Sequence, residues 1–197
     1  MNVILATEDE LSEAIAEKLL REANSQIKIL QKLRKGGFGY LYSRMDSWRQ
    51  ISRQTPVFLF TDLDSLECAP SLIERWCGGK SLGDNLHIRV AVREVESWLL
   101  ADREAMRSLI GAKGKIPNAP DDLNDPKIEL LKLANKASKD VRLDLVNQTS
   151  SCLRQGLGYN ARLIAHVQDL WSPERAAVHS PSLKRTRIRL ESLLSSK

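Results

Sequence analysis

Carboxylates stand directly after short apolar segments at three places in this chain. The five side chains concerned are Glu8, Asp62, Asp64, Glu94 and Glu96. The apolar segments that precede them are residues 2–6, 56–61 and 86–92. Hard carboxylate oxygens suit Mg²⁺ or Mn²⁺, which bind few carboxylates and keep several waters for a phosphate substrate. The pattern therefore points to metal-assisted chemistry on a phosphate group, provided that the fold brings these acids together.

The apolar segments have the composition of buried β-strands. Segments 2–6, 56–61 and 86–92, together with the alternating segment 25–30, each predict a strand, and helical patterns separate them. This alternation is typical of α/β proteins, so we predict a mainly parallel four-stranded sheet flanked by helices. Ligands bind at the carboxyl ends of the strands in such sheets. The three acidic groups are therefore expected on one rim.

Local signals indicate where the first helices begin and end. Thr7 and Glu10 have the spacing of a capping box, which predicts that a helix starts directly after the first strand. A basic, glycine-rich loop is expected at residues 34–39, followed by one helix to about Ser52. Bare glycine amides beside Lys and Arg can hold a phosphate, although a solvated turn explains the same residues.

Each acidic group taken alone has a simpler explanation. An Asp-x-Asp after a strand is common in turns and helix caps, and Glu8 suits the first turn of a helix, where a negative charge complements the helix dipole. Glu94 and Glu96 could likewise be acids at a helix start. The expected convergence of all three groups on one sheet edge is what favours a metal site.

The pattern of elements changes after Gly111. Residues 1–110 are predicted to form the α/β domain, and residues 111–197 a helical annex packed on it. Three pairs of an N-cap residue and a proline, each expected to start a helix, are Asp125-Pro126, Ser172-Pro173 and Ser180-Pro181.

Basic residues are concentrated in two regions, although the net charge is only +5. Residues 21–55 hold eight basic and two acidic side chains, and residues 174–197 hold six and two. Such regions suit a polyanionic partner, because phosphate contacts release counterions; solvated helix faces are the alternative. The residues that we expect to contact nucleic acid, whether DNA or RNA, are Arg34, Lys35, Arg93, Lys184 and Arg185.

Cysteine content and hydropathy bear on where the protein works. Three widely spaced cysteines do not form a disulfide framework and fit a reducing cytoplasm. No apolar run reaches the roughly 18–20 residues that span a bilayer, and the acidic N-terminus lacks the features of a signal peptide. We therefore expect a cytoplasmic protein without a membrane segment.

Five segments together resemble a bacterial family of small TOPRIM-like proteins, which includes the AriB-like nuclease effector of a two-component anti-phage system. The segments are GGFG, TDLDSLECAP, REVESWLLAD, NDPK and HSPSLKR. More distantly, the chain resembles the overcoming-lysogenisation-defect nucleases. The resemblance spans nearly the whole chain and implies a TOPRIM-like sheet with a C-terminal helical subdomain.

The resemblance also implies roles for particular residues. In TOPRIM nucleases the glutamate after the first strand and the Asp-x-Asp pair hold divalent metals, which carries over to Glu8, Asp62 and Asp64 here. Glu96 would be a further catalytic residue, with Asp102 as a supporting or capping acid. The family glutamate is commonly followed by glycine, whereas Asp9 follows it here. This departure leaves Glu10 as an alternative ligand.

The expected activity is a Mg²⁺- or Mn²⁺-dependent nuclease that acts as a toxic effector in phage defence under the control of an ATPase partner. A homodimer is compatible with this expectation. The alternative is a non-catalytic adaptor or sensor subunit that keeps the fold and binds nucleic acid or a partner protein. A binding module would hold nucleic acid equally well in EDTA, so metal dependence separates the two.

Overall fold

The computed structural model describes residues 1–34, 38–149 and 152–195. Backbone contacts divide the chain into two compact units. The first comprises Met1–Val92 with Arg185–Lys197, and the second comprises Arg93–Lys184. The boundary that we expected after residue 110 therefore falls inside the second unit.

The first unit is built on a sheet of four parallel strands in the order β2-β1-β3-β4. The strands are β1 (Asn2–Thr7), β2 (Lys28–Leu33), β3 (Val57–Asp62) and β4 (Leu86–Ala91). The helices of this unit are α1 (Glu10–Ala23), α2 (Phe38–Ser43), α3 (Met45–Ser52), α4 (Ala69–Cys77) and, from residue 185 on, α11 (Pro181–Leu194). The predicted α/β class, with a parallel four-stranded sheet flanked by helices, is confirmed.

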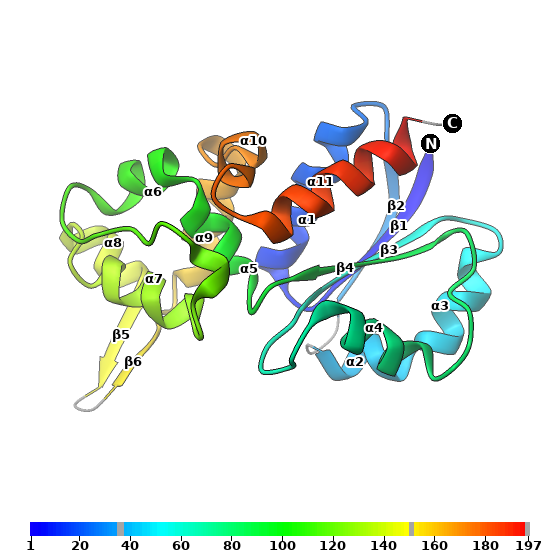
Figure 1. Ribbon diagram of the computed structural model, residues 1–197. Coiled ribbons are helices and arrows are strands. Elements are labelled where there is room, and N and C mark those ends of the chain that lie inside the picture. Colours follow the sequence, from blue (N-terminus) through cyan, green and yellow to red (C-terminus); the bar gives the residue numbers. More distant parts are fainter. Residues whose placement is uncertain (35–37, 150–151, 196–197) are drawn as a thin grey trace. The chain divides into compact units, whose positions relative to one another are not determined.

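Helices cover both faces of this sheet. One face carries Ile4, Leu59 and Ile88, which are buried against α2, α3 and α4 together with Trp48 and Trp76. Side chains alternate between the faces of a strand, so the neighbouring residues of each strand point to the other face. Figure 1 shows α1 and α11 on that second side. Burial on both faces explains why β1 and β3 read as continuous apolar runs.

Helix α1 starts two residues later than the capping box predicted. Thr7 is still part of β1 and pairs with Phe60 of β3. Asp9 is the N-cap instead, and its side chain accepts a hydrogen bond of 2.8 Å from the backbone N–H of Ser12. The prediction of Thr7 as N-cap is wrong because the strand ladder holds Thr7 in an extended conformation.

The single helix expected before Ser52 is broken into α2 and α3. The break lies at Arg44, between the two helices. The buried indole N–H of Trp48 donates to the carbonyl oxygen of Leu41 at 3.0 Å. This side-chain contact uses a carbonyl at the end of α2 and fixes the turn, which no local sequence pattern indicated.

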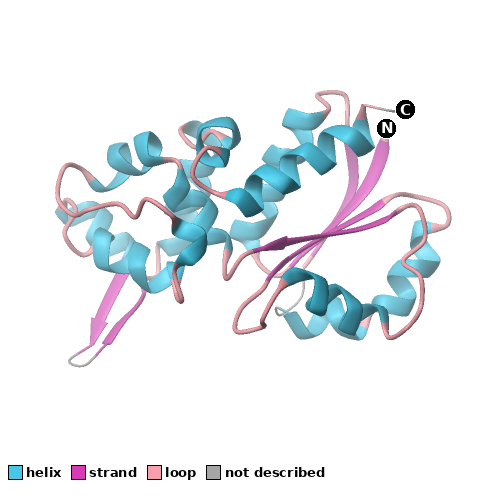
Figure 2. Ribbon diagram, viewed as in Figure 1, coloured by secondary structure: helices cyan, strands magenta, loops and turns pink. Residues whose placement is uncertain are grey.

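The second unit contains helices and one hairpin. The helices are α5 (Val95–Ala101), α6 (Arg103–Ile110), the 3₁₀ turn η1 (Pro120–Asp122), α7 (Pro126–Ala134), α8 (Lys139–Leu145), α9 (Tyr159–Asp169), α10 (Pro173–Ala177) and the start of α11. The antiparallel strands β5 (Val146–Thr149) and β6 (Cys152–Gln155) form the hairpin, shown as a separate pair of arrows in Figure 2. Only helices were predicted for this part of the chain, so the hairpin was not expected.

All three predicted N-cap and proline pairs are confirmed as helix starts. Asp125 accepts the N–H of Ile128 at 2.8 Å, and Ser172 accepts the N–H of Arg175 at 3.3 Å. The hydroxyl of Ser180 accepts the N–H of Leu183 at 3.2 Å.

Among the described helices, none combines the length and apolar character needed to cross a membrane.

Candidate functional site

The strand order places a topological switch point between β1 and β3. From β1 the chain continues through α1 to β2, and from β3 it continues through α4 to β4 on the other side. The two connecting helices lie on opposite faces of the sheet, as Figure 1 shows. In open parallel sheets such a point leaves a crevice beyond the carboxyl ends of the strands, where ligands bind. Glu8 and Asp62 stand at these two strand ends.

Glu8 is held at the end of the neighbouring strand. Its Oε1 atom accepts the backbone N–H of Asp62 at 2.9 Å and the hydroxyl of the buried Thr61. β1 ends at Thr7, so no further backbone carbonyl of this strand pairs with β3. The side-chain carboxylate of Glu8 accepts the Asp62 N–H instead. The glutamate that the sequence singled out is thus fixed by contacts 53 and 54 residues away in the chain.

The Asp-x-Asp segment forms a corner at the end of β3. Leu63 is buried and its N–H donates to the carbonyl of Ala91 on β4 at 2.9 Å. Asp64 then adopts a left-handed conformation with φ of 50°, a region that aspartate tolerates better than most residues. This corner presents the exposed Asp64 carboxylate at the same strand ends as Glu8.

Like charges surround the Glu8 carboxylate. Burial raises the pKa of Glu8 above its ordinary value, and the charges of Asp64 and Asp9 raise it further. The hydrogen bonds from Thr61 and from the Asp62 N–H act in the opposite direction. The two like charges beside Glu8 favour a bound cation, because a cation reverses the sign of the interaction that opposes ionisation of Glu8.

The acids do not form a complete metal cage. Within the described residues, no three His, Cys, Asp or Glu side chains are arranged to hold a metal ion among themselves. Mg²⁺ does not need such a cage, because it commonly takes one or two carboxylates and completes its shell with water and substrate phosphates. Glu8 and Asp64 fit that limited role.

Sequence reasoning missed two residues of this site, Thr61 and Asp9. Thr61 lies inside an apolar strand, where a threonine carries no separate signal. In the sequence Asp9 is only a departure from the family pattern, although its charge lies close enough to raise the pKa of Glu8. The spacing of Asp9 and Ser12, typical of an N-cap and its N3 residue, could have identified it as a cap.

The structure separates the two candidate glutamates of the first strand end. Glu10 forms an ion pair with Arg34 and is half exposed, whereas Glu8 contacts Thr61 and Asp62. Arg34 also pairs with Glu13 at 2.9 Å. Two acids of α1 therefore neutralise the arginine that was expected to bind phosphate.

Glu94 and Glu96 belong to the second unit, where both have partners. Glu96 is 2% exposed, and its Oε1 atom accepts the hydroxyl of Tyr159 at 2.8 Å and lies 3.4 Å from the Lys127 ammonium. Glu94 accepts the backbone N–H of Lys127 at 2.9 Å, at the start of α7. Burial raises the pKa of Glu94, and the charge of Glu96 adds to this effect. A catalytic role for Glu96 stays a prediction. Its contacts with Lys127 and Tyr159 link α5 to α7 and α9 inside the second unit.

Asp102 is fully buried and caps α6. Its carboxylate accepts the N–H of Ala105 at 3.2 Å and the N–H of Ser172 at 2.7 Å. The guanidinium of Arg175 donates to both of its oxygens, at 2.9 and 2.8 Å. Asp102 therefore fastens α10 to the start of α6 within the second unit.

The remaining expected nucleic-acid contacts fall in different settings. Lys35 lies outside the described residues. Arg93 is half-buried, and its backbone adopts a left-handed conformation with φ of 63°. Lys184 and Arg185 are both exposed on α11, but as consecutive helical residues they point about 100° apart.

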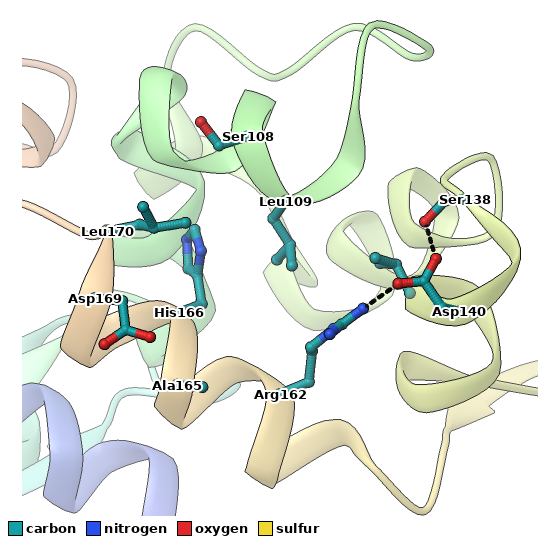
Figure 3. Close-up of a pocket in the computed structure, with 10 residues that line it drawn as sticks. Ser108, Leu109, Ser138, Asp140, Arg162, Ala165, His166, Asp169 and Leu170 are labelled. Atoms are coloured by element: carbon teal, nitrogen blue, oxygen red, sulfur yellow. Dashed lines mark hydrogen bonds and ion pairs between the residues drawn. The ribbon is translucent and has the colours of Figure 1, made fainter.

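A cavity of about 380 Å³ in the second unit contains none of the predicted site residues. Its lining includes Asp140, Arg162 and the buried His166 (Figure 3). Arg162 donates to Asp140 at 2.6 Å, and Ser138 donates to the same carboxylate. The Ser138 hydroxyl and the Arg162 guanidinium together lower the pKa of Asp140 to about 2. Asp140 and Arg162 of this cavity thus already have partners, which makes it a weaker candidate than the strand-end site.

Comparisons of the chain with protein-family models, with curated proteins and with solved structures find no match.

Proposed function

We propose that this chain is a TOPRIM-like nuclease that uses Mg²⁺ or Mn²⁺ to hydrolyse nucleic-acid phosphodiesters. The observation that carries the proposal is the Glu8 carboxylate at the switch point of the sheet. It is fastened to β3 through Thr61 and Asp62, and its neighbours are the carboxylates of Asp64 and Asp9. This arrangement keeps negative charge concentrated where α/β sheets bind phosphate-bearing ligands.

Each residue of the site has a distinct part in the proposal. Glu8 and Asp64 would hold the ion, with Asp62 at the rim of the same strand end. The chemistry supplied by a bound ion would be polarisation of a phosphoryl oxygen and a lowered pKa of a water molecule. Thr61 positions Glu8 by donating to it, and the buried Leu63 fixes the corner that presents Asp64.

The finer parts of the proposal rest on the sequence resemblance. They are a TOPRIM identity for the sheet, a role for the second unit as the C-terminal helical subdomain, and action in the cytoplasm as a phage-defence effector. An ATPase partner would control the activity, since the sequence has no complete P-loop: Glu74 stands where the motif before Gly79-Lys80-Ser81 needs a glycine.

The test is divalent-dependent cleavage of a mixed pool of DNA and RNA by the purified full chain, alone and with the proposed ATPase partner. We expect the wild type to cleave with Mg²⁺ or Mn²⁺ and to stop in EDTA. Asp64→Asn should abolish cleavage. Asp84→Asn is the matched control, because this exposed aspartate precedes β4, at the opposite end of that strand.

Two outcomes would overturn the proposal. If Asp64→Asn cleaves at the wild-type rate, the Asp-x-Asp segment forms a turn and does not bind the metal. Tight nucleic-acid binding that is equal in Mg²⁺ and in EDTA, with no cleavage in either condition and with or without the ATPase, would establish the adaptor alternative instead.

A further inference from the structure

Arg89 occupies an unusual position on the edge strand β4. The alternate residues Leu86, Ile88 and Val90 are buried in the core with α2, α3 and α4. Arg89 therefore points to the other face of the sheet, the side that α11 covers in Figure 1. Its partner across the strand pair is the buried Phe60, so its guanidinium extends between an apolar surface and a helix.

The two flanks of α11 differ in how their charges are compensated. Arg187 donates to both carboxylate oxygens of Glu22 at 3.1 Å, so its flank faces α1. Arg185 and Arg189 are four residues apart and thus point only about 40° from each other, whereas Arg187 points about 200° from both. These two arginines therefore lie on the flank away from α1, and the charge of Arg189 acts on Arg89.

Part of the Arg89 guanidinium has no hydrogen-bond partner among the described residues. Its Nε atom is buried and makes no hydrogen bond. Burial, with the charge of Arg189 as a smaller contribution, lowers the pKa of Arg89 to about 10. A buried donor without an acceptor costs free energy, and a like charge beside it adds to that cost. An anion between the two guanidinium groups would relieve both costs.

Four other arginines of the first unit have acidic partners. Arg21, Arg34, Arg49 and Arg187 all form ion pairs with acids. In the part of the chain that the structure describes, no ion pair involves Arg89, Arg185 or Arg189. Arg44, Arg53 and Arg75 form no ion pair with the described residues either, but they belong to or flank α3 and α4 on the other face of the sheet. On the side that α11 covers, uncompensated arginine charge thus lies along β4 and one flank of α11.

We propose that Arg89, Arg185 and Arg189 form a binding site for backbone phosphates of a nucleic acid. This proposal rests on the proposed function, and it locates the surface that would hold the nucleic-acid strand to be cleaved. Guanidinium groups present several N–H donors in a fixed plane that matches phosphate oxygens. Two of the three arginines are four residues apart on one helix, which suits a polyanion rather than a single small anion. Lys184, although adjacent to Arg185, does not belong to the site.

The experiment measures binding of a fluorescent single-stranded oligonucleotide in EDTA over a series of NaCl concentrations. Because EDTA removes divalent ions, the result is independent of the metal site. Each lost phosphate contact should reduce the slope of log K against log salt by about 0.7. We expect this reduction for Arg89→Gln and for Arg189→Gln, and a larger one for the double variant.

The matched control is Arg53→Gln, which removes one exposed positive charge at the end of α3, a helix on the other face of the sheet. Its slope should equal that of the wild type. Arg189 is exposed on a helix, so its variant folds even if Arg89→Gln does not. The thermal melting temperature of Arg89→Gln should be unchanged or higher, because the variant removes a like-charge contact.

Three outcomes decide the proposal. Unchanged slopes for both arginine variants would overturn it, even if Asp64-dependent cleavage is found. Reduced slopes would support it, even if the chain does not cleave, so the two proposals fail separately. Inorganic phosphate that raises the melting temperature as much as the oligonucleotide does, at equal phosphate concentration, would overturn the assignment to a polynucleotide and leave a small-anion site.

Discussion

Glu8 in the first unit and Asp102 in the second unit are carboxylates in similar local positions with opposite electrostatics. Both lie next to the start of a helix, and both accept backbone N–H groups. The pKa of Glu8 is raised by burial and then by Asp64 and Asp9. Burial also tends to raise the pKa of Asp102, but the hydrogen bonds from Arg175, Ser172 and Ala105 outweigh it and lower the pKa overall.

The difference lies in the partners that carry charge. Asp102 meets a guanidinium on both oxygens, so its charge is matched inside the second unit. Among the described residues, Glu8 receives only neutral donors, and it faces other carboxylates. A matched carboxylate stabilises the fold, whereas an unmatched one among like charges stores repulsion that a cation can relieve. This contrast separates a structural acid from a candidate catalytic acid more sharply than sequence position does.

The largest expected effect is at Glu8. Glu8→Gln should abolish divalent-dependent cleavage, because it removes one of the two ligand carboxylates. The free energy of unfolding should stay unchanged or rise, since the variant removes a disfavoured charge and keeps an oxygen for Thr61 and the Asp62 N–H. Cleavage assays with Mg²⁺ and urea denaturation test both halves. A clear loss of stability without loss of cleavage would place Glu8 in the same class as Asp102.

The converse effect is expected at Asp102. Asp102→Ala should destabilise the protein by roughly 2–4 kcal/mol, because it removes a helix cap and several hydrogen bonds that contribute about 1 kcal/mol each. Asp102→Asn keeps an acceptor for the cap and should lose about half as much. Urea denaturation measures both variants. Cleavage per folded molecule should be unchanged, and a selective loss of activity would break the comparison.

A smaller effect should follow from the residue that positions Glu8. Thr61→Val preserves shape in the strand but removes the hydroxyl that donates to Glu8. Groups that orient metal ligands typically contribute about 10–100-fold in metal affinity or activity, and we expect a loss of that size. Mn²⁺ titration separates weaker metal binding from misfolding. Thr61→Ser, which restores the donor, should recover most of the loss.

The smallest effect is the pH dependence of stability. Since folding raises the pKa of Glu8, its contribution is present below the ordinary glutamate pKa of about 4.3 and is lost as pH rises through the raised value. Folding lowers the pKa of Asp102, so its contribution is present above about 3.9 and is lost as pH falls through the lowered value.

Unfolding free energies of the wild type, Glu8→Gln and Asp102→Asn across the acidic range test these signs. The stability of Glu8→Gln relative to the wild type should grow as pH rises, whereas that of Asp102→Asn should grow as pH falls. Parallel curves for both variants would contradict the opposite shifts on which the comparison rests.

The sequence by itself determined the elements whose signals are local. The apolar runs of β1 and β3 follow from burial on both sheet faces, and the alternation of strands with helices predicted the parallel sheet. The pairs Asp125-Pro126, Ser172-Pro173 and Ser180-Pro181 marked helix starts because capping involves residues only three apart. Sheet topology then predicted that Glu8 and the Asp-x-Asp segment would meet.

Only the tertiary structure decided which charges have partners. Glu10 and Glu13 neutralise Arg34 across two elements, Thr61 fastens Glu8 from 53 residues away, and Arg89 meets Arg189 without an acid. The pattern of a strand or helix fixes the direction of a side chain but not what lies opposite it. Charge compensation depends on those distant neighbours, because Coulomb interactions are strong only over a few ångströms in a folded chain.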